Sequence, residues 1–99
     1  SMAYFVESLF PLVDNFEIAL SQDEVNKEIE TFSSLLTSLL ESLQVEEVGS
    51  VGDDFDPNIH EAVEHNGEGD TQKVEAVLRK GYLFQGNLIR PAMVKVKSE

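Results

Sequence analysis

The spacing of apolar residues changes near Val45, and this change constrains the fold more than any other feature of the sequence. Before Val45, apolar residues recur every three or four positions, as they do on one face of an α-helix. After Val45, all six glycines and two of the three prolines separate short apolar runs, as turns separate short strands. The sequence therefore predicts an α+β fold, with a helical domain over residues 1–47 and a small all-β domain over residues 48–99.

A first helix is predicted from Phe5 to Leu20. Its apolar residues share one helical face: Phe5, Leu9, Leu12, Val13, Phe16 and Leu20. Pro11 lacks a backbone N–H donor, and its ring crowds the preceding turn. We therefore expect a kink at Pro11 rather than a break.

A second helix is predicted to begin at Gln22 or Asp23, because Ser21 and Glu24 have the spacing of a capping box. Its apolar residues follow a heptad seam: Val25, Ile29, Phe32, Leu36, Leu39 and Leu43, widened by Leu35 and Leu40. The connection between the two helices is short, which favours an antiparallel αα-hairpin.

Two helices of this kind carry more apolar surface than they can bury against each other, and burial contributes about 25 cal/mol per Å². We expect a second copy of the chain to cover the remainder, giving a homodimer with a four-helix bundle. The predicted dimer interface consists of Leu9, Leu12, Phe16, Ile29, Phe32, Leu36, Leu39 and Leu43. The alternative is that the hairpin packs on the C-terminal half of its own chain.

The second half is predicted to consist of short strands. The segment 85–87, Gln-Gly-Asn, has a glycine at the second central position of a tight turn, and the apolar runs 82–84 and 88–89 flank it. This pattern indicates a β-hairpin. Between Met93 and Lys97 valines alternate with lysines, as in a strand with one buried face.

Residues 53–61 form the densest polar cluster and the best candidate for a metal site. Tested as a calcium loop starting at Asp54, the segment has Ile59 where glycine is required and His65 where glutamate is required. His60 and His65 also lack the His-Glu-x-x-His spacing of a zinc site. The chain has no cysteine, no Gly-rich phosphate loop and no nucleophile motif, so the sequence predicts neither a catalytic metal nor an enzyme.

A structural role suits this segment better. Residues 56–58, Asp-Pro-Asn, have the composition of a turn that caps a short helical turn. Such a turn would carry Ile59, Ala62 and Val63 toward the interior. His60 is then expected to be a packing and hydrogen-bonding residue.

The charge balance narrows the choice of partners. Seven Lys and Arg residues stand against 19 Asp and Glu residues, a formal net charge of −12. Residues 1–48 carry ten acidic residues and one basic residue, and residues 49–99 carry nine and six. Nucleic acids and anionic membranes require clustered basic residues, and a membrane span requires about 18 consecutive apolar residues. We therefore expect neither nucleic acid nor a membrane as a partner, and we expect a function that depends on contacts with other proteins.

Three motifs in the second half resemble the C-terminal signature of the GrpE family, the nucleotide exchange factors of DnaK-type chaperones. They are residues 55–62 (FDPNIHEA), 77–82 (VLRKGY) and 88–96 (LIRPAMVKV), in the order of the family. Residues 12–17 resemble the end of the family's long helix, and residues 29–45 its short bundle helix. The resemblance covers nearly the whole chain but only the latter part of a family member, and it implies long paired helices before Phe5.

The resemblance implies a co-chaperone of protein folding and the stress response. In this family a homodimer uses its β domain to bind the ATPase domain of a DnaK-type chaperone, and it promotes ADP release by favouring the open nucleotide cleft. The resemblance implies no cofactor, and a location in the bacterial cytoplasm or an organelle matrix. A dimeric adaptor that binds another protein through the β domain is the alternative function.

The motifs also imply which residues contact the chaperone. Carried over by motif position, these are Phe55, Pro57, Leu78, Asn87 and Val96. Four of the five are apolar, as the centre of a protein interface requires. For Phe55, Leu78 and Val96 the alternative is a place in the core of the β domain.

Overall fold

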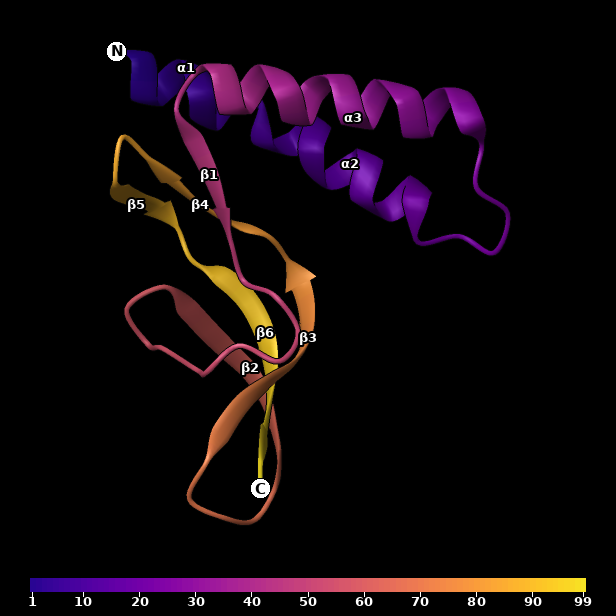
Figure 1. Ribbon diagram of the computed structural model, residues 1–99. Coiled ribbons are helices and arrows are strands. Elements are labelled where there is room, and N and C mark those ends of the chain that lie inside the picture. The colour runs from indigo at the N-terminus through magenta and orange to yellow at the C-terminus, as the bar shows by residue number, and fades with distance from the viewer. The chain divides into compact units, whose positions relative to one another are not determined.

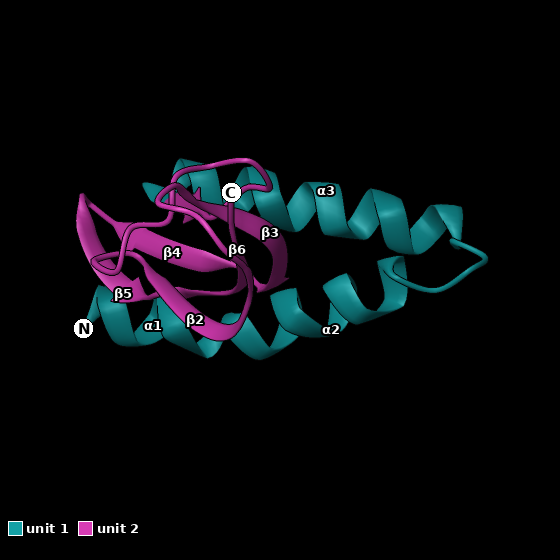
Figure 2. Ribbon diagram, turned by 90° about the horizontal axis from the view of Figure 1, so that it is seen from below, with its two compact units in different colours: residues 1–45 teal, residues 46–99 magenta.

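The computed structural model describes residues 1–99, in which three helices precede six strands (Figure 1). The chain divides into two compact units, residues 1–45 and residues 46–99 (Figure 2). The first unit is helical and the second contains two three-stranded sheets. The predicted α+β fold with a β-rich C-terminal part is confirmed.

The N-terminal segment is a bent helix, as predicted, and the bend lies at Leu9. Helix α1 (Met2–Ser8) ends before Leu9 and helix α2 (Phe10–Leu20) begins after it. Leu9 keeps helical dihedral angles, with φ −85° and ψ −15°. Pro11 lies in the first turn of α2, where a missing N–H donor is tolerated. The proline therefore bends the segment without ending it.

The predicted start of the second helix is wrong. Helix α3 spans Lys27–Ser42, and the N-cap is Asn26, whose Oδ1 accepts hydrogen bonds from two backbone amides of the first turn at 2.8 and 3.1 Å. The Ser21 hydroxyl instead donates to the Ile18 carbonyl, at 2.7 Å, at the end of α2. Because Ser21 belongs to the preceding helix, no capping box forms, and Val25 lies in the connection between the helices.

Helices α2 and α3 pack together as the predicted antiparallel αα-hairpin (Figures 1 and 2). Among the residues predicted for the dimer interface, Leu36 is buried, whereas Leu12, Phe32 and Leu39 keep 48%, 53% and 46% of their surface exposed. The other four are half-buried: Leu9, Phe16, Ile29 and Leu43. Three of the residues predicted for the dimer interface are therefore exposed apolar side chains.

The larger sheet of the second unit has the strand order β2-β6-β3. Strand β2 (His60–Gly67) runs parallel to β6 (Ala92–Ser98), and β6 pairs antiparallel with β3 (Gln72–Arg79). The predicted alternation in β6 is confirmed, because its valines are buried while its lysines reach the surface. The buried apolar residues of the larger sheet form one cluster, here called the core cluster: Val74, Ala92, Val94 and Val96.

The smaller sheet has the order β1-β4-β5, built from β1 (Val45–Val48), β4 (Gly81–Phe84) and β5 (Asn87–Arg90). Strands β4 and β5 form the predicted antiparallel hairpin around Gln85 and Gly86. Both turn residues have positive φ angles, 51° and 82°, as a type I′ turn requires. Glycine at the second position removes most of the steric cost of this turn.

Candidate partner-binding surface

The loop Phe55–Ile59, here called the contact loop, precedes β2 and runs from the outer edge of β3 to the start of β2. At its first residue, the Phe55 amide donates to the Gln72 carbonyl on β3, at 3.0 Å. At its last residue, the Ile59 carbonyl accepts from the Ala92 amide on β6, at 2.9 Å. Both ends of the contact loop are therefore held by backbone bonds to the larger sheet.

Inside the contact loop, Asp56 caps a tight turn. Its Oδ1 accepts from the backbone amide of Asn58 at 2.9 Å and from the side-chain amide of Asn58 at 3.0 Å. Its carbonyl accepts from the amides of Ile59 at 3.1 Å and His60 at 2.8 Å. The predicted turn is confirmed, and it leaves Pro57 exposed at its tip.

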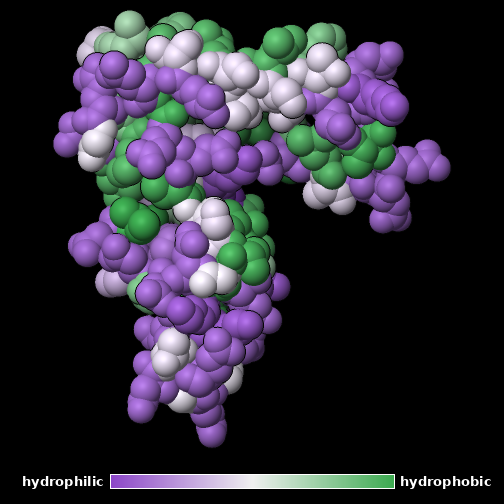
Figure 3. Space-filling model, in the orientation of Figure 1, coloured by the Kyte–Doolittle hydropathy of each residue, from purple (hydrophilic) through white to green (hydrophobic).

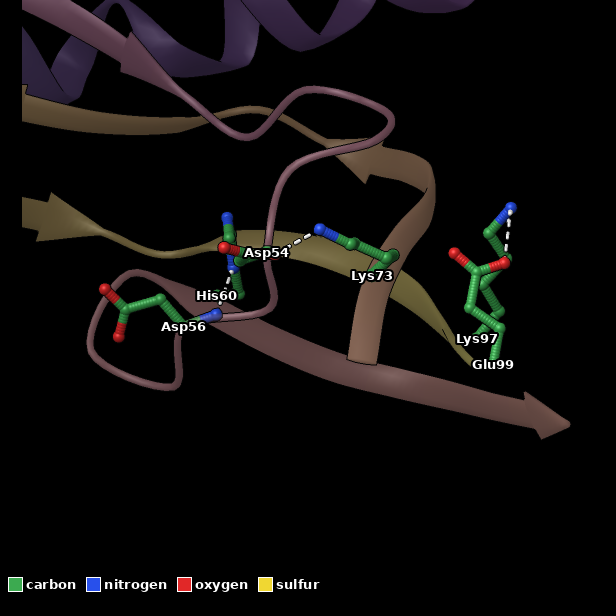
Figure 4. A network of polar contacts seen from close by, with 6 residues as sticks. All are labelled: Asp54, Asp56, His60, Lys73, Lys97 and Glu99. Atoms are coloured by element: carbon green, nitrogen blue, oxygen red, sulfur yellow. Dashed lines mark hydrogen bonds and ion pairs between the residues drawn. The ribbon is translucent and has the colours of Figure 1, made fainter. Parts of the chain in front are cut away.

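His60 lies at the junction of the contact loop and β2. Its side chain is buried, and its Nδ1 accepts a hydrogen bond from the Asp56 amide at 2.9 Å (Figure 4). Its ring stacks on the ring of Phe55, with centroids 5.8 Å apart and an interplanar angle of 27°. The predicted packing and hydrogen-bonding role of His60 is confirmed.

The helical turn ends earlier than predicted. The chain becomes extended at His60, so Ala62 and Val63 lie on β2, and both are exposed. The prediction that these two residues point inward is wrong, because strand geometry replaces the helical turn that would have carried them to the core.

Leu78 is exposed because of a β-bulge. Val77 pairs with Val94 and Arg79 pairs with Met93, so Leu78 is an extra residue without a partner on β6. A bulge interrupts the regular alternation of side chains along a strand. Leu78 keeps 52% of its surface exposed, which leaves an aliphatic side chain available for contact at the end of β3.

The structure brings the last residue of the contact loop and Leu78 to the same end of the larger sheet, whereas the loop begins beside Gln72 at the opposite end of β3. Met93 pairs with Glu61 on β2 and with Arg79 on β3. The start of β2 and the end of β3 are therefore two strand spacings apart, roughly 10 Å. Pro57 lies in the contact loop, three residues before β2 begins at His60, and Leu78 is the residue before Arg79 on β3.

The other three residues of the expected contact set lie in different environments. Phe55 is half-buried, and its ring packs against the core cluster. Asn87 is exposed and follows the turn of the β4–β5 hairpin (Figure 1). Val96 is only 1% exposed and belongs to the core cluster, so its side chain has no surface to offer a partner. We therefore leave Val96 out of the proposed contact surface.

Sequence reasoning missed three exposed apolar side chains of the second unit, one of which is Leu88 on β5, 42% exposed. Val63 lies at a bulge between Ala62 and Glu64 and is 44% exposed, and Val51 lies in a turn and is 69% exposed. The alternation of side chains along a strand gives no signal for a bulge, because the bulge depends on the pairing of the backbone with the neighbouring strand.

One ion pair ties the segment before the contact loop to β3. Lys73 on β3 donates to the Asp54 carboxylate, and the two residues also form an isolated antiparallel β-bridge (Figure 4). The hydrogen bond from Lys73, together with its charge, lowers the pKa of Asp54. The same hydrogen bond and the charge of Asp54 raise the pKa of Lys73.

Neither a metal site nor a membrane-spanning helix is found along the described chain, residues 1–99. No three of its His, Asp and Glu side chains gather closely enough to hold a metal ion. None of its helices has both the length and the apolar character needed to cross a membrane.

The fold defines an α+β protein in which an αα-hairpin precedes a small unit of two sheets, with exposed apolar side chains on both parts. The sequence model of the GrpE family matches residues 1–98. The chain belongs to the GrpE family.

Its curated relatives are similar over nearly the whole chain. The Protein GrpE of Corynebacterium efficiens is 42% identical over 90% of this chain, which corresponds to 38% of the relative. The Protein GrpE of Coprothermobacter proteolyticus is 42% identical over 92% of this chain and 40% of the relative. The Protein GrpE of Exiguobacterium sibiricum is 40% identical over 92% of this chain and 53% of the relative. The chain thus spans about half the length, or less, of these relatives.

Proposed function

We propose that this chain is the part of a nucleotide exchange factor that dimerises and binds a DnaK-type chaperone. Membership of the GrpE family supports this co-chaperone function. The observation that carries it is that Leu78, exposed near the end of β3, and the last residue of the contact loop, which carries exposed Pro57, lie at the same end of the larger sheet. The predicted β domain, residues 48–99, then contacts the ATPase domain of the chaperone.

Exchange in this proposal depends on differential binding. The chaperone ATPase domain samples open and closed nucleotide clefts, and a partner that binds the open form more tightly shifts the population toward it. ADP affinity then falls by the same factor by which the partner prefers the open form. The chain forms no covalent bond and transfers no group in this process.

The predicted helical domain, residues 1–47, supplies the proposed dimer. Leu12, Phe32 and Leu39 are large apolar residues about half exposed on α2 and α3. Figure 3 shows hydrophobic residues along the helices, whereas the end of the second unit around the β2–β3 connection is mostly hydrophilic. A second copy of the hairpin would cover these residues in a four-helix bundle. The bacterial relatives make the bacterial cytoplasm the proposed location.

Release of a fluorescent ADP analogue from a purified DnaK-type chaperone tests the proposed function. We expect the chain to accelerate release in a saturable manner when unlabelled nucleotide is in excess. The absence of acceleration at saturating chain would overturn the proposal. Capture of a different protein with no effect on nucleotide release would favour a dimeric adaptor instead.

A further inference from the structure

We propose that His60 is a positioning residue: its Nδ1 holds the Asp56 amide and thereby fixes the contact loop in the conformation that exposes Pro57. The effect on chaperone binding rests on the proposed function. The effect on the contact loop itself can be measured without any partner.

The imidazole makes two contacts with the contact loop and is almost completely shielded from solvent. His60 is 4% exposed, its ring stacks on Phe55, and its Nδ1 accepts from the Asp56 amide at 2.9 Å. The backbone of His60 donates in return to the Asp56 carbonyl at 2.8 Å. Asp56 and His60 are therefore joined by two hydrogen bonds, which close a turn that contains residues 57–59.

The environment of the other ring nitrogen, Nε2, indicates that the His60 side chain does more than fill space. Because Nδ1 accepts a hydrogen bond, a neutral ring carries its proton on Nε2, and this buried nitrogen has no acceptor among the protein atoms. A buried donor without an acceptor is destabilising. An aliphatic side chain of similar size would avoid this penalty, so the Nδ1 bond to Asp56 is what the imidazole contributes.

Loss of this bond would affect the part of the contact loop that faces the partner. The Asp56 carboxylate caps Asn58, and Pro57 lies between them with a fixed φ angle. If the Asp56 amide loses its acceptor, the capped turn can rotate relative to β2. Pro57 would then no longer be held in one position relative to the start of β2, which lies at the same end of the larger sheet as the end of β3.

Two substitutions separate the acceptor from the packing. His60→Asn places a carbonyl oxygen on Cγ, where Nδ1 is attached in histidine, so it retains an acceptor for the Asp56 amide. His60→Leu keeps apolar volume and has no acceptor. A role in packing alone predicts that leucine substitutes at least as well as asparagine, whereas a positioning role predicts the reverse.

The test compares amide hydrogen exchange at Asp56 and binding to the chaperone ATPase domain. We expect His60→Leu to raise the amide exchange rate of Asp56 about tenfold and to raise the Kd for the ATPase domain about tenfold. For His60→Asn, we expect both quantities to stay within about threefold of their values in the original chain. Equal or better performance of His60→Leu in either measurement would overturn the positioning role.

Nitrogen chemical shifts of the unsubstituted chain give a second readout that needs no variant. We expect the neutral His60 ring to carry its proton on Nε2, with Nδ1 as the hydrogen-bonded acceptor. A proton on Nδ1 in the neutral ring would overturn the inference even if both variants unfolded. If the original chain does not bind the chaperone, the proposed function fails, and the exchange measurement still decides whether His60 positions the contact loop.

Discussion

Gly81 lies so close to Ala92 that a Cβ on residue 81 would come within 2.3 Å of the Ala92 nitrogen. The same Cβ would lie 2.7 Å from the Pro91 carbonyl carbon and 2.8 Å from a methyl group of Val48. Two of these three neighbours are backbone atoms, which cannot move aside as a flexible side chain can. The start of β4 therefore approaches the start of β6 only because residue 81 has no side chain.

Gly81→Ala is expected to lower the free energy of unfolding by about 1–3 kcal/mol, because the backbone must shift to admit the methyl group. Urea denaturation followed by circular dichroism measures this loss. Gly86→Asn is the matched control, since Gly86 has a φ of 82° but open space around its Cβ position, and asparagine tolerates this φ. Equal midpoints for the two variants would contradict the close approach.

Asn26→Ala is expected to destabilise the chain by about 1 kcal/mol, because two amides at the start of α3 lose their acceptor. Ser21→Ala is the control, because the exposed Ser21 hydroxyl bonds only within the last turn of α2 and its neighbourhood. Thermal unfolding compares the two variants directly. A larger loss for Ser21→Ala would restore the capping box expected from the sequence.

The boundary between α2 and α3 shows what periodicity can and cannot predict. The apolar spacing predicted both helices, because packing requires a continuous apolar face. Ser21 and Asn26 are both good capping residues, however, and only the structure shows that Ser21 bonds to the helix before it. The hairpin around Gly86 was predictable because its turn requires positive φ angles, which favour glycine.

The candidate surface was suggested by the motifs and not by the apolar patterning. Leu78 is exposed through a bulge, and Val96 is buried by regular alternation in β6. The motifs placed both in the same contact set, because a motif does not distinguish residues that support the fold from residues that face a partner. Burial separates the two roles.

The ion pair of Asp54 and Lys73 predicts a pH dependence of the segment before the contact loop. Because Lys73 lowers the pKa of Asp54, the stabilisation is complete above the ordinary range of a carboxyl group and is lost as the pH falls through the lowered value. Because Asp54 raises the pKa of Lys73, the stabilisation persists up to the ordinary lysine range and is lost as the pH rises through the raised value.

An NMR titration of the Asp54 carboxyl carbon measures the acid limb. We expect Lys73→Met to raise the pKa of Asp54 toward its ordinary value, and concentrated salt to reduce the shift, because the Asp54 carboxylate is exposed. Lys97→Met is the control, since Lys97 pairs with Glu99 at 3.9 Å instead. An equal effect of both substitutions would show that general charge, rather than this pair, sets the pKa.

Sedimentation equilibrium tests the proposed dimer. We expect the chain to sediment as a dimer, and Leu39→Asp to raise the dimer dissociation constant by at least about tenfold, because a carboxylate would be buried in the bundle. Ser34→Asp adds the same charge at an exposed polar position of α3 and serves as the control. A monomer at every concentration would contradict the bundle, and so would equal effects of the two substitutions.

The affinity of the chain for the isolated ATPase domain of a DnaK-type chaperone tests the central claim most directly, when Leu78→Asp is compared with Val51→Asp. Both residues are exposed aliphatic side chains of the second unit, and both substitutions add one negative charge. The account predicts that Leu78→Asp raises Kd by at least about tenfold, the loss expected when a central apolar contact is removed, while Val51→Asp leaves Kd nearly unchanged. Unchanged binding by a folded Leu78→Asp variant would contradict it.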